Sequence, residues 1–92
     1  MAIQSEIELE AVLNRVIIKM DKHIAERGTW PILEEVRRTL EQARGVSRQG
    51  AKLKALREKL RTASETTGSA VPLDSALLDD LWDIEDYVDY RA

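Results

Sequence analysis

Apolar residues recur every three or four positions along four stretches of this 92-residue chain, and this spacing constrains the fold more than any other feature. Such a stripe has to be buried along one side of a helix, because the positions between are charged or polar. A chain of this length buries only about 60–65% of its unfolded surface, which supports one core. We therefore predict a single all-α domain over residues 1–92, a small four-helix bundle-like fold with an extended or dimer-forming helical arrangement.

Capping and turn residues place the ends of these helices. Ser5 and Glu8 have the spacing of a capping box, and Asp74 or Ser75 can cap the last helix. Small polar residues with a glycine and a proline predict a linker over residues 65–73. The predicted helices cover approximately residues 5–27, 30–44, 47–64 and 74–90.

Two of these helices carry more apolar surface than one small core requires. The first has a buried stripe that includes Leu13 and Met20, yet Ile7 and Ile18 project to the opposite side. The third has a leucine seam with coiled-coil spacing, formed by Leu53, Leu56, Leu60 and Ala63. These surplus surfaces predict a homodimer.

Cysteine content and hydropathy restrict the environment of the chain. The sequence has no cysteine, which excludes disulfides and thiolate metal sites. It has no apolar run long enough to span a bilayer, and its first residues do not have the pattern of a signal peptide. We therefore expect a cytoplasmic protein that makes no membrane contact.

Charge is strongly segregated along the chain, although the net charge is only −3. Residues 37–61 contain nine basic and two acidic residues, a local balance of +7. Residues 74–91 contain seven acidic residues and one arginine, a local balance of −6. The two segments therefore suggest different binding surfaces.

The last predicted helix places carboxylates and aromatic rings together. When it is projected at 100° per residue, Asp79, Asp80, Asp83 and Asp86 lie opposite the leucines, with Tyr87 and Tyr90 among them. Acids near the end of a helix oppose its dipole, so local stability does not explain them. We predict that this surface binds a basic protein through Asp79, Trp82, Asp83, Asp86, Tyr87 and Tyr90.

Two other interpretations of the acidic helix remain open. The acids can form a solvated face that partly neutralises Lys52, Arg57 and Lys59 on the third helix. Metal binding is the weaker alternative, because a straight helix does not wrap its carboxylates around an ion as a calcium loop does.

The basic segment suggests a nucleic-acid alternative. The stretch "LEQARGVSRQGAKLKAL" resembles the turn of a helix-turn-helix motif, with Leu40 in the core and Gly45 at the turn. Three positions depart from the motif, because Arg44 and Lys54 replace buried apolar residues and Ala51 is small. The nucleic-acid-binding residues would be Arg44, Arg48, Gln49, Lys52 and Lys54.

No catalytic motif or cofactor fingerprint is present, and the single histidine, His23, lacks a sequence neighbour suited to metal binding or catalysis. We therefore predict a non-enzymatic interaction module without a cofactor, such as an adaptor, an inhibitor or an immunity-type protein. It would present the acidic, tyrosine-containing C-terminal helix to a basic partner. The alternative is a small helix-turn-helix-like DNA-binding regulator that uses residues 44–61.

Overall fold

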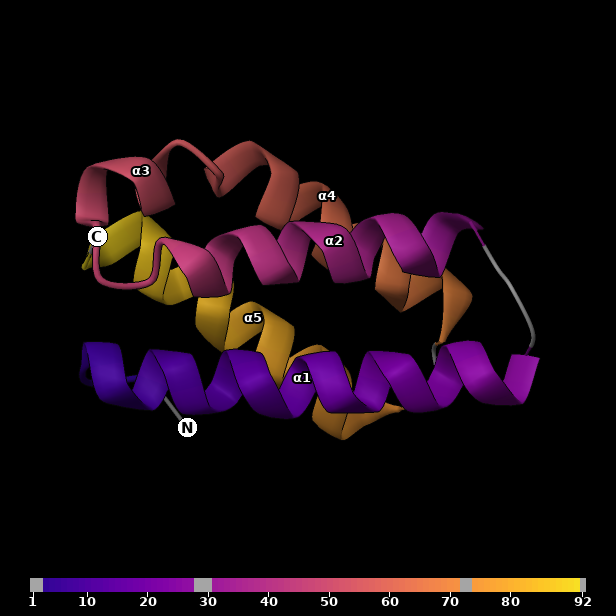
Figure 1. The fold of residues 1–92 in the computed structure, drawn as a ribbon. Helices are drawn as coiled ribbons and strands as arrows, with labels where there is room; N and C mark the ends of the chain where they lie inside the picture. Colours follow the sequence, from indigo (N-terminus) through magenta and orange to yellow (C-terminus); the bar gives the residue numbers. More distant parts are fainter. Residues whose placement is uncertain (1–2, 28–30, 72–73, 92) are drawn as a thin grey trace.

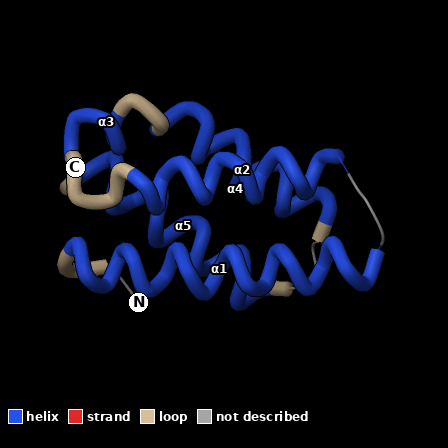
Figure 2. The backbone as a smooth tube through the Cα atoms, viewed as in Figure 1, coloured by secondary structure: helices blue, strands red, loops and turns tan. Residues whose placement is uncertain are grey.

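The structure is a computed structural model that describes residues 3–27, 31–71 and 74–91. Within these ranges the chain forms helices and no strand (Figures 1 and 2). The elements are α1 (Glu6–Arg27), α2 (Pro31–Gly45), α3 (Gly50–Lys54), α4 (Arg57–Ala70) and α5 (Ser75–Tyr90).

The four long helices follow an up-and-down course. In Figure 1, α1 and α4 run away from the end where both termini lie, whereas α2 and α5 run back toward it. Helix α1 packs against α2 and α5, and α4 packs against the same two helices. The all-α, bundle-like prediction is therefore confirmed. The radius of gyration of 12.1 Å is close to the ~12 Å of a compact chain of this length.

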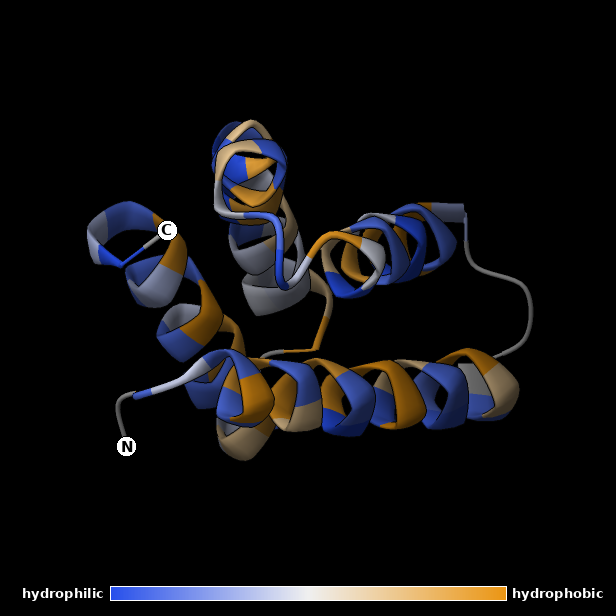
Figure 3. Ribbon diagram, turned by 60° about the vertical axis from the view of Figure 1, so that its left-hand side comes forward, coloured by the Kyte–Doolittle hydropathy of each residue, from blue (hydrophilic) through white to orange (hydrophobic). Residues whose placement is uncertain are grey.

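One hydrophobic core fills the space between these helices. Figure 3 shows that each long helix carries both hydrophobic and hydrophilic positions, as expected when one side faces a core. The predicted stripes of α1, α2 and α5 supply most of the buried side chains. Fully buried large residues include Leu9, Leu13, Met20, Leu33, Leu40, Leu53, Leu77 and Ile84. Ile32 at the beginning of α2 is exposed.

The predicted caps of α1 and α5 are present. The Ser5 hydroxyl accepts a hydrogen bond from the Glu8 amide at 3.2 Å, and the Glu8 carboxylate accepts one from the Gln4 amide at 3.0 Å. Asp74 caps α5, because its Oδ1 accepts a hydrogen bond from the Leu77 amide at 3.0 Å. These contacts satisfy amides that have no partner inside the helix.

The prediction of one continuous helix over residues 47–64 is wrong. Residues 46–48 form a turn, and the helical segment beyond it divides into α3 and α4. At the division, the Leu56 amide bonds the Leu53 carbonyl at 3.0 Å, three residues back instead of four. Leu53 on α3 and Leu60 on α4 are both buried in the core.

The predicted linker over residues 65–73 is also wrong over most of its length, because α4 continues to Ala70. Thr67 and Val71 are buried in the described part of this segment, and their packing outweighs the weak helix propensity of the small polar residues around them. Residues 72 and 73 of that prediction, like residue 30 of the second predicted helix, lie outside the described residues.

The leucine seam does not provide a dimer surface in this fold. Leu53, Leu60 and Ala63 are buried in the core of the same chain, and Leu56 packs against it. Of the two predicted dimer surfaces, the second apolar face of α1 is the one that stays exposed in the described structure, with Ile7 and Ile18 at 73% and 68% of their full exposure. Among the described helices, none has both the length and the apolar content needed to cross a bilayer.

Candidate acidic docking surface

Helix α5 is divided along its length into a buried side, two shoulders and an open strip. Leu77, Leu81, Ile84 and Val88 form the buried side. One shoulder faces α1 and the other faces α4, because α5 packs against both helices. The acidic residues of α5 therefore have different neighbours depending on the side from which they project.

On the α1 shoulder, Asp80 is held by two basic side chains. Arg15 donates from Nε to Asp80 Oδ2 at 2.9 Å and from Nη2 to Oδ1 at 2.8 Å. Lys19 Nζ lies 3.9 Å from the same carboxylate. This contact raises the pKa of the Arg15 guanidinium above its ordinary value. Asp80 is only 9% exposed, so its expected place on the open acidic face is wrong.

On the α4 shoulder, Glu85 and Asp89 meet two arginines. Arg61 Nε donates to Glu85 Oε1 at 3.2 Å, and Arg61 Nη2 lies 3.8 Å from Asp89 Oδ2. Arg57 Nε lies 3.6 Å from Asp89 Oδ1. Acidic residues of α5 therefore pair with basic residues of the same chain at this shoulder, as one interpretation of the sequence expected. Arg57 is one of the basic residues expected there, whereas Arg61 makes the contacts expected of Lys52 and Lys59.

The remaining polar surface is a strip that we call the α5 strip: Asp79, Trp82, Asp83, Asp86 and Tyr90. Trp82 is 55% exposed and Tyr90 is 84% exposed, although both are large aromatic residues. Asp79 and Asp86 are exposed and have no ion-pair partner within the described ranges. Asp83 is half-buried, and its charge contributes to the raised pKa of Arg15.

The structure brings together five of the six residues predicted to bind a basic partner. Tyr87 differs, because its half-buried ring packs against the hydrophobic core on the side toward α1. Truncating Tyr87 would therefore disturb stability as well as any binding surface. Trp82 and Tyr90 are the aromatic side chains of the strip that remain accessible to a partner.

The predicted nucleic-acid residues do not lie on one continuous helix. Gln49 is the N-cap residue of α3, and Arg48 lies in the turn before it. Arg44 donates to Asn14 Oδ1 at 3.0 Å, and Arg48 lies 3.4 Å from Glu10 Oε2. Lys52 and Lys54 are exposed on α3, which is only five residues long.

A polar contact joins α1 to the beginning of α5. His23 Nε2 lies 2.8 Å from Asp74 Oδ2, and both side chains are largely buried. The hydrogen bond from His23, aided by the Leu77 amide, lowers the pKa of Asp74 below its ordinary value. His23 thus has a structural partner 51 residues away instead of a catalytic one.

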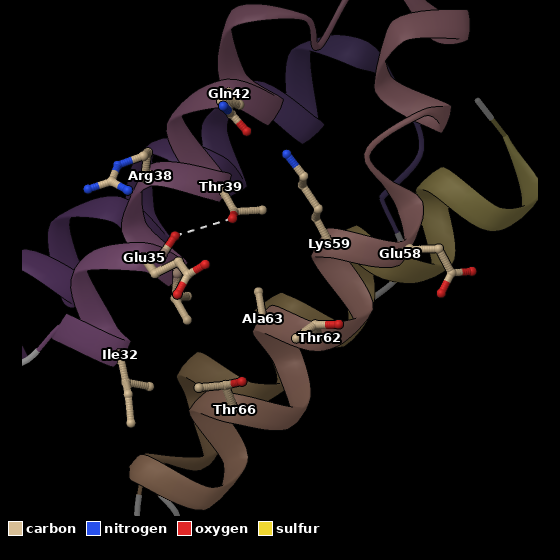
Figure 4. Close-up of a pocket in the computed structure, with 11 residues that line it drawn as sticks. Ile32, Glu35, Arg38, Thr39, Gln42, Glu58, Lys59, Thr62, Ala63 and Thr66 are labelled. Carbon is tan, nitrogen blue, oxygen red and sulfur yellow. Dashed lines mark hydrogen bonds between the residues drawn. The ribbon is translucent and has the colours of Figure 1, made fainter.

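A groove of about 550 Å³ lies between α2 and α4 (Figure 4). Thr39 and Glu35 line one wall, and Lys59 and Thr66 line the other. Its charged residues include both signs, and the Thr39 hydroxyl donates a hydrogen bond to the Glu35 carbonyl at 3.2 Å. The groove is a mixed polar surface separate from the α5 strip.

Sequence reasoning missed Arg15, Lys19 and Arg61 as neighbours of the acidic helix. Arg15 and Asp80 are 65 residues apart, and helical projection alone does not show which helices pack side by side. The prediction placed Asp80 opposite the leucines, but at 100° per residue it projects only about 40° from Ile84, and this closeness was the available indication that it would contact a neighbouring helix.

Within the described ranges, no three acidic or histidine side chains are arranged to hold a metal ion. The carboxylates of α5 point toward different neighbours instead of one centre. No known protein family, curated protein or solved structure matches this chain.

Proposed function

We propose that this chain is a non-enzymatic protein-interaction module, such as an adaptor, an inhibitor or an immunity-type protein, that presents the α5 strip to a basic partner. The observation that carries the proposal is the exposure of Trp82 and Tyr90 beside Asp79 and Asp86, two carboxylates without an ion-pair partner within the described ranges. Tryptophan is highly buried on average in folded proteins, and an exposed tryptophan on the same helix side as an exposed tyrosine is typical of a contact surface.

The two kinds of residue in the strip would have different tasks. Trp82 and Tyr90 supply large contact areas with few rotatable bonds, which makes such residues frequent anchors at protein interfaces. Asp79 and Asp86 would attract a positively charged partner and exclude acidic ones. An arginine of the partner can also stack on an aromatic ring while it pairs with a neighbouring carboxylate.

The assignment is also supported by a difference between the acidic residues of the α5 strip and those on the two shoulders of α5. Asp80, Glu85 and Asp89 contact basic residues of α1 and α4, which accounts for their charge within the fold. Asp86 lies in the second half of α5, where a negative charge opposes the helix dipole. Its contribution to local stability is therefore unfavourable, and an external partner gives it a role.

The proposal includes cytoplasmic residence and a homodimer. The dimer is supported by Ile7 and Ile18, which stay exposed on α1 after the core is formed. A dimer would carry two α5 strips, and two strips can increase the apparent affinity for a partner with repeated basic sites.

Affinity capture with charge-matched variants tests the α5 assignment. Immobilised wild-type protein should retain basic proteins that an Asp79→Asn, Asp86→Asn variant loses. The control is Glu26→Gln, Glu65→Gln, which removes two exposed carboxylates from other helices. Equal capture by both variants would show that net charge, and not the α5 strip, selects the proteins.

A small DNA-binding regulator remains the second candidate. It is favoured by Lys52 and Lys54, which are exposed and have no ion-pair partner within the described ranges. The short α3 offers few base contacts, so phosphate contacts would supply most of the affinity.

A further inference from the structure

Helix α1 has an apolar outer face that the fold leaves without a neighbouring helix. Ile7 and Ile18 are 73% and 68% exposed, and Ala11 and Ala25 are exposed beside them. These four residues are separated by four, seven and seven positions, so they project within about 40° of one another around the helix. We call this set the outer face of α1.

Polar contacts lie along the edge of the outer face that is next to α2. Asn14 accepts a hydrogen bond from Arg44, Asp21 accepts one from Arg37, and Glu10 pairs with Arg48. All three contacts direct the polar side chains of α1 toward basic residues that follow α1 in the chain. They therefore leave the isoleucines uncovered.

Basic side chains of α1 that contact α5 lie along the other edge of the outer face. Arg15 turns toward Asp80, and Lys19 lies beside the same carboxylate. Long basic side chains often cover exposed apolar surface with their methylene groups, but these two are engaged at α5. Lys22 is the exposed basic residue near this edge that has no ion-pair partner within the described ranges.

We propose that the outer face of α1 pairs with the outer face of α1 from a second copy, with the two helices antiparallel. The spacing of four and seven residues is that of a coiled-coil seam. A two-fold axis near residue 16 places Ile7 opposite Ala25 of the second copy and Ile18 near Asn14 of the second copy. Each large side chain then meets a smaller one, which suits close packing.

Charge complementarity selects the antiparallel orientation and the second copy as the occupant. Glu8 and Lys22 flank the same side of the outer face, 14 positions apart, one near each end of α1. An antiparallel pair brings Glu8 of each copy beside Lys22 of the other, which forms two ion pairs. On the opposite flank it brings Glu10 near Asp21 of the other copy, and Arg48 and Arg37 already pair with these two acids. A parallel pair would bring the two acidic beginnings of α1 together, where Glu6 and Glu8 would repel their equivalents.

This interface is small, since it covers two isoleucines and two alanines from each copy. We therefore expect reversible dimerisation, with a dissociation constant between about 10 μM and 1 mM. The proposal does not depend on the partner of the α5 strip, because the outer face and the strip use different residues.

Sedimentation equilibrium between about 10 μM and 1 mM tests the interface. The average mass should rise from 10.5 kDa toward twice that value with concentration. Ile18→Glu should keep the protein monomeric, whereas Ile32→Glu, at an exposed isoleucine of α2, should leave dimerisation unchanged. Circular dichroism would check that both variants are folded. A monomer mass up to 1 mM, or equal effects of the two substitutions, would overturn the proposal.

A double-mutant cycle tests the orientation. Glu8→Gln keeps an acceptor for the Gln4 amide while it removes the charge, and Lys22→Gln removes the opposite charge. These residues lie about 21 Å apart along one helix, too far for direct coupling in physiological salt. Each single variant should weaken dimerisation about two- to fivefold, and the double variant no further. If the two substitutions weakened dimerisation independently, so that their effects multiplied in the double variant, the antiparallel arrangement would be contradicted. Asp79→Asn, Asp86→Asn should dimerise as the wild type does.

Discussion

Arg15 on α1 holds Asp80 on α5 through two hydrogen bonds, from Nε at 2.9 Å and from Nη2 at 2.8 Å. This pair crosses the contact between the two helices, and Asp80 is nearly buried. It therefore differs from an exposed ion pair such as Arg48–Glu10, whose side chains are 65% and 41% exposed.

Removing Arg15 should destabilise the fold. Arg15→Ala leaves the Asp80 carboxylate poorly solvated, and we expect a loss of about 1 to 3 kcal/mol in the free energy of unfolding. Urea denaturation gives this difference. Arg48→Ala breaks an exposed pair with Glu10 and should change the free energy by less than about 0.5 kcal/mol. Equal losses in both variants would mean that the Arg15–Asp80 contact has no special role.

The Asp74 cap should make stability depend on acidic pH. Hydrogen bonds from His23 and the Leu77 amide lower the pKa of Asp74 in the folded state. Its charged form therefore stabilises the fold above the ordinary carboxyl pKa of about 3.9. This contribution is lost as the pH falls through the lowered folded-state pKa.

The corresponding variant is Asp74→Ala. It should be less stable than wild type by about 1 to 2 kcal/mol near neutral pH, through the lost cap. The difference should shrink when urea denaturation is repeated below pH 4. Asp74→Asn keeps a capping oxygen and should fall between the two proteins at neutral pH. A difference that stays constant down to pH 2 would be inconsistent with this linkage.

Thr67 offers a stabilising substitution. Its side chain is fully buried, and its hydroxyl oxygen has no hydrogen-bond partner within the described ranges. Thr67→Val keeps the shape and removes the unsatisfied group, so unfolding should cost about 1 kcal/mol more. Thermal unfolding of Thr67→Val beside the exposed control Thr62→Val would measure the effect. A destabilised Thr67→Val would indicate that the hydroxyl has a partner.

The DNA-binding alternative makes a separate prediction about salt. A protein with six or more phosphate contacts should lose about a thousandfold or more in affinity for random duplex DNA between 50 and 200 mM salt. Lys52→Ala, Lys54→Ala should weaken that binding and reduce its salt dependence. Fluorescence anisotropy with labelled duplex DNA gives both quantities. If wild type does not bind even at 50 mM salt, this alternative has no support.

The stripes of buried apolar residues were predictable because the spacing of residues within one helix determines each stripe. Leu13 and Met20 were expected in the core from their helical spacing alone, and both are fully buried. The caps at Ser5 and Asp74 were predictable for the same reason, since each depends on residues within one turn.

Contacts between helices account for what the sequence could not predict. The burial of Asp80 depends on Arg15, which a distant helix supplies. The extension of α4 depends on the packing of Thr67, which outweighs its weak helix propensity. The leucine seam is lost as a dimer surface because Leu53, Leu60 and Ala63 pack into the core of the same chain.

The shared placement of most candidate residues was predictable, because the periodicity of one helix determines it. Asp79, Trp82, Asp83, Asp86 and Tyr90 share the side of α5 that faces away from the buried leucines. Tyr87 was assigned less accurately, because its ring lies at the boundary with α1 and packs against the core. Neither the spacing nor the charge of α5 identifies the partner protein.

Nuclear magnetic resonance with a defined peptide would show whether the α5 strip binds a basic partner. An arginine-rich amphipathic helical peptide would be titrated into ¹⁵N-labelled protein, with an acidic peptide of equal length as control. Amide shifts should concentrate at Asp79, Trp82, Asp83, Asp86 and Tyr90 and should be lost in Trp82→Ala, Tyr90→Ala. Absence of binding, or shifts concentrated on other helices and unchanged in that variant, would contradict the claim.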